Sequence, residues 1–185
     1  MPKVKGLAFR SVMDSVEELG GAPARQRVLE NLPTELRKSF DYRSVLAGNW
    51  YPIEDYAALW RGVHKAMGNR SDTAHKVGRA CVVRDVGGVH KFIISFLSRE
   101  TVVALSARLF RLYYDTGKAS TELVGQRMAK VTFEGCVGFS ALMWAEVVGS
   151  TEMFTEIGSK VSARAFLERG GGDGDPGAVI AVSWG

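Results

Sequence analysis

Apolar residues recur at helical spacing through the first two thirds of the chain. The first apolar face predicts a helix that ends at the Gly20–Gly21 pair, since glycine favours the C-terminal end of a helix. That face consists of Phe9, Val12, Met13, Val16 and Leu19. The same spacing predicts further helices over residues 23–32, 53–67, 71–86 and 98–117.

The hydrophobic period changes after residue 117. Residues 118–123 and 127–134 alternate between apolar and polar side chains, which predicts a β-hairpin. A helical pattern follows, and then two more alternating segments predict strands at 160–168 and 178–184. The predicted fold class is therefore α+β, with a helix-rich N-terminal two thirds packed on a C-terminal antiparallel sheet of β-β-α-β-β order.

The length and composition predict one domain. The chain has 185 residues and 46% of them are hydrophobic, which suits a single core of ordinary size. We expect a single domain over residues 1–185, with a helical part at 1–117 and a sheet-containing part at 118–185.

The stretch GGGDGDP at 170–176 is the most unusual in composition. A phosphate-binding loop of the Walker or Rossmann kind leads from a strand into a helix, whereas an alternating segment follows this one. A calcium loop of the EF-hand kind needs a glutamate at its twelfth position, and none follows at that distance. A hairpin loop is the expected structure.

Charge and cysteine content exclude several classes of protein. The net charge of +4 is modest and dispersed, so we expect no nucleic-acid binding. The two cysteines lack the spacing of a zinc site or a disulfide framework. The start MPKVKGLAFR has no apolar signal-peptide segment, and no apolar run is long enough to span a membrane, so we expect a cytoplasmic protein.

The sequence shows no catalytic or metal-binding constellation. His64, His75 and His90 have no metal-ligand spacing, and neither HExxH nor GxSxG is present. The adjacent carboxylates Glu17–Glu18 and Glu54–Asp55 point about 100° apart on a helix and cannot face each other across a substrate. We therefore predict that the protein is not an enzyme and holds no metal.

Aromatic residues gather around Trp50–Trp60 and around Phe110–Tyr114. Such clusters are typical of a core with a polar-tipped edge, or of an aromatic-lined pocket between helices and sheet.

Four segments, taken in order, carry a resemblance that covers nearly the whole chain. They are VKGLAFRSVMDSVEELGG, NWYPIEDY, RLFRLYYDTGKA and GDPGAVIAVSW. Together they resemble an uncharacterised family of myxobacterial paralogues of about 200 residues. That family is distantly similar to haem-NO-binding domains and vinyl-reductase-type ligand domains, which share their α+β fold with TRAPP trafficking subunits. The resemblance implies a sensory ligand domain or an assembly module.

Haem is an alternative cofactor that the resemblance raises. Haem-NO-binding domains use a proximal histidine and a Tyr-x-Ser-x-Arg motif, of which Ser106 and Arg108 are present while Ala104 replaces the tyrosine. His90 precedes these residues too closely. We therefore expect no cofactor.

The resulting hypothesis is a non-enzymatic signalling module that binds a small, mostly apolar molecule between helices and sheet. The residues expected to line its ligand site are Trp60, His64, Arg108, Tyr113 and Trp144. The alternative is a protein-interaction or scaffolding module that acts as a homodimer on a protein partner and needs no ligand.

Overall fold

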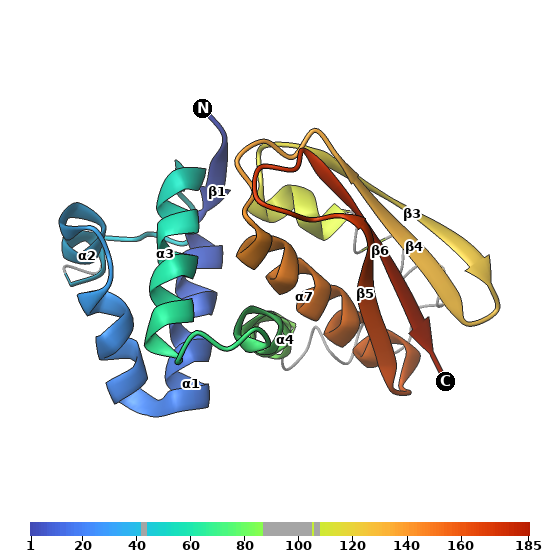
Figure 1. Cartoon of the computed structure of the whole chain (residues 1–185), viewed down its shortest axis with the longest axis horizontal. Coiled ribbons are helices and arrows are strands. Elements are labelled where there is room, and N and C mark those ends of the chain that lie inside the picture. The colour runs from blue at the N-terminus through green and yellow to red at the C-terminus, as the bar shows by residue number, and fades with distance from the viewer. Residues whose placement is uncertain (42–43, 87–104, 106–107) are drawn as a thin grey trace.

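The computed structural model describes residues 1–41, 44–86, 105 and 108–185 of the chain. Helices α1 (Gly6–Glu30), α2 (Thr34–Asp41) and α3 (Ile53–Ala66) form one side of the molecule (Figure 1). The sheet of β3 (Lys118–Gly125), β4 (Met128–Glu134), β5 (Ala163–Gly170) and β6 (Gly177–Trp184) forms the other side. Helices α4 (Thr73–Asp85) and α7 (Ala141–Ser159) lie between them.

The predicted α+β order is confirmed in the described residues. The four-stranded sheet has the order β3-β4-β6-β5 and every neighbouring pair is antiparallel. Gly170–Gly177 joins β5 to β6, so the glycine-rich stretch is the predicted hairpin loop. The break predicted at Gly20–Gly21 is also present, because Gly21 has a φ of 71° inside α1 and Pro23 follows it.

Three elements were not predicted. Strands β1 (Lys3–Lys5) and β2 (Trp50–Pro52) pair antiparallel, and each is too short for an alternating pattern to be visible. Helix α2 begins directly after Pro33 and buries Leu36 and Phe40. The central strand β6 lies where a strand was predicted, at 178–184, but its burial does not alternate. Residues 178–182 are all buried, because β4 and β5 flank the strand on its two edges and α7 packs against it.

Helices α4 and α7 pack against each other at two glycines. A Cβ atom on Gly78 would lie 3.0 Å from the carbonyl carbon of Glu146, and closer still to the carbonyl oxygen. A Cβ atom on Gly149 would meet the His75 carbonyl group in the same way. Each helix thus places a glycine where the backbone of the other passes, which brings the side chains of both helices into one site.

Polar contacts fix this helix pair. Arg79 of α4 donates to Glu152 at 2.6 Å and to Glu156 at 2.7 Å, both on α7. At the start of α7, the Ser140 hydroxyl caps the helix by accepting a hydrogen bond from the Met143 amide. Across the described ranges, no helix combines the length and apolar character that crossing a membrane requires.

Candidate functional site

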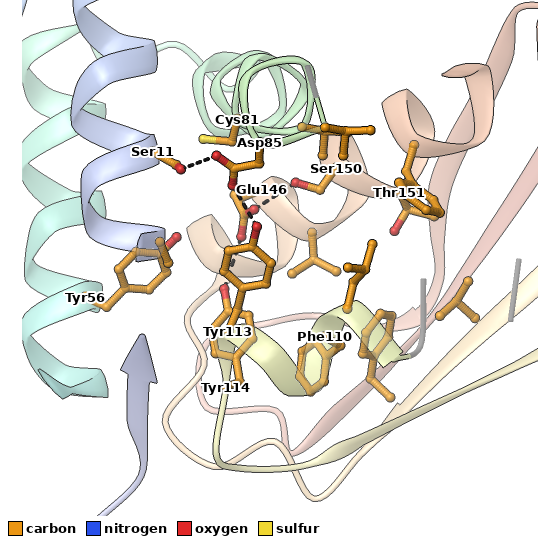
Figure 2. Close-up of a pocket in the computed structure, with 18 residues that line it drawn as sticks. Ser11, Tyr56, Cys81, Asp85, Phe110, Tyr113, Tyr114, Glu146, Ser150 and Thr151 are labelled. Carbon is orange, nitrogen blue, oxygen red and sulfur yellow. Dashed lines mark hydrogen bonds between the residues drawn. The ribbon is translucent and has the colours of Figure 1, made fainter. Parts of the chain in front are cut away.

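A cavity of about 170 Å³ lies where α1, α3, α4 and α7 meet strand β4 and the helical residues 108–113 (Figure 2). Its apolar wall includes Val82, Val86, Leu109, Phe110, Val131, Phe133, Val147 and Phe154. An engineered cavity of ~150 Å³ in another protein stays dry and binds benzene, so this volume suits a ligand of about one aromatic ring.

Two carboxylates make the other wall polar. Asp85 of α4 accepts hydrogen bonds from the Ser11 hydroxyl at 2.5 Å and from the Tyr113 hydroxyl at 2.7 Å. Glu146 of α7 accepts from the Ser150 hydroxyl at 2.8 Å and from the Tyr114 hydroxyl at 3.3 Å. Figure 2 shows these groups gathered on one side of the cavity, between α1 and α7.

Burial alters how these groups titrate. It raises the pKa of Glu146 to about 7, with a smaller contribution from the nearby Asp85, although the Ser150 and Tyr114 hydrogen bonds oppose the shift. Burial also raises the pKa of Asp85, against the hydrogen bonds from Ser11 and Tyr113. The polar wall therefore holds two carboxyl groups whose ionisation is opposed by burial, and Glu146, with a pKa of about 7, is only partly ionised at neutral pH.

The thiol in the cavity wall is unsuited to nucleophilic catalysis. Cys81 lies on α4, and the Ser15 hydroxyl is 3.5 Å from its sulfur. Burial, followed by the charge of Glu146, raises its pKa far above neutrality, so it stays a protonated thiol. In the described part of the chain, no three His, Cys, Asp or Glu residues form a group that could hold a metal ion.

The predicted ligand residues are not brought together at this cavity. Tyr113 lines it, whereas Trp60 and Trp144 are fully buried in the core behind it. Trp60 packs edge-on against Tyr56 at a ring-centroid distance of 6.2 Å, and Trp144 packs against Phe133 at 5.6 Å. The two tryptophans therefore support lining residues rather than form the wall.

The other two residues of that prediction lie elsewhere. His64 is half-buried on α3 outside the cavity lining, and Arg108 is exposed to solvent. The cavity lining includes none of Trp60, His64, Arg108 and Trp144. Whether any of the four contacts a ligand stays a prediction.

The sequence reasoning missed the two carboxylates, and one of them had a visible signal. Glu146 is the only charged residue in the apolar stretch ALMWAEVVG, residues 141–149. A lone acid in such a helix is rarely buried without a partner or a purpose. Asp85 had no comparable signal, since it follows Arg84 near the end of its helix.

The fold is that of H-NOX (haem-NO/oxygen-binding) domains. The unliganded Fe(II) H-NOX protein from K. algicida superimposes with a TM-score of 0.69 at 12% identity, covering 98% of this chain and 96% of that one. An oxygen-bound H-NOX domain related to soluble guanylate cyclases gives 0.68 at 12% identity, with 97% and 94% covered. A mutant H-NOX from T. tengcongensis gives 0.65 at 14% identity, with 97% of each chain covered.

At sequence identities of 12–14%, these similarities establish the fold alone. The resemblance to haem-NO-binding domains is confirmed at that level, whereas membership of the myxobacterial family stays a prediction. No family model matches the chain, and no curated protein matches it.

Haem does not fit the described lining. Proteins hold haem iron through histidine, cysteine thiolate, methionine or tyrosine. Cys81 and three tyrosines, Tyr56, Tyr113 and Tyr114, line the cavity, but burial raises the pKa of each far above neutrality. The charged side chains that line it are Asp85 and Glu146, which would repel the haem propionates. His90 and Ser106 lie outside the described residues.

Proposed function

We propose that this chain is a non-enzymatic sensory module that binds a small, mostly apolar ligand in the cavity bounded by α1, α4, α7 and β4. The observation that carries the proposal is the cavity itself. Its aromatic and aliphatic wall would gain free energy by burying apolar surface, and its polar wall would orient one end of the ligand. The H-NOX-like fold supports the proposal as a fold of ligand-sensing domains.

The arrangement suits a sensor because the cavity joins parts of the chain that are distant in sequence. Asp85 on α4 is hydrogen-bonded to Ser11 on α1 and to Tyr113, which precedes the sheet. A ligand in contact with these groups would stabilise one arrangement of the helical side relative to the sheet. Differential binding of that kind is what a ligand needs in order to shift a conformational equilibrium.

The test is thermal unfolding with and without benzyl alcohol, a neutral probe of about the cavity's size. A ligand present at 100 times its Kd stabilises the folded state by ~2.7 kcal/mol, and we expect a corresponding rise in Tm. Val147→Phe would place a ring in the cavity and abolish the rise, while Val137→Phe, at an exposed site, would retain it.

The same rise in the wild type and in Val147→Phe would place binding elsewhere and overturn the proposal. No rise in any of the three proteins would also overturn it. The alternative, a scaffolding module that acts as a homodimer, stays a prediction, as does the cytoplasmic location.

A further inference from the structure

We infer that the ligand of this cavity is an organic amine that carries a positive charge at neutral pH, with a body of about one aromatic ring. The inference rests on the proposed function and names the chemical class of its ligand. Three features carry it: the two carboxyl groups of the polar wall, the lack of a salt bridge from either of them to a lysine or arginine of the described residues, and the aromatic lining.

The first two features concern charge. Neither Asp85 nor Glu146 forms a salt bridge with a lysine or arginine of the described ranges. Burial raises the pKa of Asp85 and the charge of the neighbouring Arg84 opposes that shift, but the Arg84 guanidinium group pairs with Glu18 and Asp14. Taking a carboxylate out of water is costly unless an opposite charge or hydrogen bonds compensate. The hydroxyl groups on Asp85 and Glu146 compensate in part, and a ligand ammonium group would supply the missing charge.

The third feature is the ring content of the lining. Tyr56, Phe110, Tyr113 and Tyr114 border the cavity beside the two carboxylates (Figure 2). Aromatic rings attract cations electrostatically, and they also bury the apolar body of an amine. With Phe133 and Phe154, six aromatic rings and two carboxyl groups line the cavity of ~170 Å³. This lining favours an arylalkyl or alkyl ammonium ion over a neutral molecule, and it disfavours carboxylates and phosphates.

Glu146 strengthens the preference of the cavity for a cation over a neutral molecule. Nearly all of its side chain is buried, and it shares the cavity with Asp85. Arrival of a cation would favour the ionised form of its carboxyl group, so binding would release a proton in neutral buffer. A neutral ligand would release none.

The experiment is isothermal titration calorimetry with three probes of matched size: benzylamine, benzyl alcohol and benzoate. For the wild-type protein we expect benzylamine to bind at least ~10-fold more tightly than benzyl alcohol, which corresponds to ~1.4 kcal/mol, and benzoate to bind most weakly. Repeating the benzylamine titration in two buffers of different ionisation enthalpy measures the released proton.

Asp85→Asn removes the charge and keeps an oxygen that can accept from Ser11. It should reduce the preference for benzylamine over benzyl alcohol to less than about threefold. Glu122→Gln, an exposed carboxylate on β3, is the matched control and should keep the preference. Glu146→Gln is the second variant and should abolish the proton release.

Failure of the inference is distinguishable from failure of the proposed function. If benzyl alcohol binds as tightly as benzylamine, or benzoate binds best, the amine assignment is overturned while a ligand cavity stands. If none of the probes binds, both are overturned.

Discussion

The substitution Gly78→Ala tests whether the close packing of α4 on α7 builds the site. In an ordinary helix interior, replacing glycine by alanine gains ~1 kcal/mol of stability. Here the new methyl group would lie 3.0 Å from the carbonyl carbon of Glu146 and closer to its oxygen, whereas ordinary contacts begin near 3.4 Å. The atoms it meets are backbone, which cannot rotate away as a side chain can.

The magnitude follows from these opposing effects. Overpacking of a well-packed interior costs ~1–3 kcal/mol, and contact with backbone places this site toward the upper end. After subtraction of the gain in helix propensity, we expect a net loss of ~1–2 kcal/mol. For a protein of this size the loss corresponds to a fall in Tm of ~2–8 °C.

The assay is thermal and urea unfolding of the wild type and Gly78→Ala, followed by benzyl alcohol binding. Because Glu146 lies at this contact, moving α4 and α7 apart would also separate Asp85 from Glu146 in the polar wall and weaken ligand binding. Gly62→Ala on α3 is the helix-matched control, since its methyl group would meet the mobile end of Leu32 at 3.1 Å. Gly48→Ala, with nothing within 4 Å, is the open-space control. An unchanged or higher Tm for Gly78→Ala would refute the packing argument.

Two further predictions concern titration and reactivity. Burial raises the pKa of Glu146 to about 7 in the folded state. The Asp85 carboxyl group adds to this shift, and the hydrogen bonds from Ser150 and Tyr114 oppose it. The other titratable groups at the cavity, Cys81, Tyr56 and Tyr113, stay neutral. A carboxyl group with a raised pKa contributes stability that is present at low pH and is lost as the pH rises toward 7. The free energy of unfolding of Glu146→Gln should therefore rise by ~2 kcal/mol relative to that of the wild type between pH 5 and pH 8, as urea titrations would show. A difference that does not depend on pH would contradict this. Cys81 and Cys136 are both buried, and burial raises the pKa of each thiol. Mass spectrometry should therefore show that iodoacetamide labels neither cysteine in the folded protein at pH 7.5 and both in urea. Rapid labelling of Cys81 in the folded state would mean that the cavity opens to solvent.

The sheet and the main helices could be predicted because their patterns are local. Alternation marked the β3–β4 hairpin, and glycine and proline marked the break in α1. Strands β1 and β2 escaped detection because three residues cannot show a period and their pairing joins distant segments. The strand at 178–184 was predicted in the right place, although residues 178–182 are all buried and do not alternate.

The site could not be predicted to the same extent. Aromatic content indicates that Trp60 and Trp144 are buried, but it does not say which side of a helix faces a cavity, and both lie behind the wall. The Ser11–Asp85 contact joins residues 74 positions apart, and no local pattern records it. By propensity alone, Gly78 weakens its helix. Glycine is required there because the Glu146 backbone passes close by, and only the tertiary structure shows that contact.

The most direct measurement of the central claim is a methyl NMR titration of valine-labelled protein with benzyl alcohol. Val82, Val86, Val131 and Val147 line the cavity, whereas Val16, Val28 and Val63 are buried in the core away from it. Binding in the cavity predicts saturable shifts of the first group while the second group stays unchanged. Shifts confined to other valines, or none at millimolar ligand, would contradict the assignment of this cavity as the ligand site.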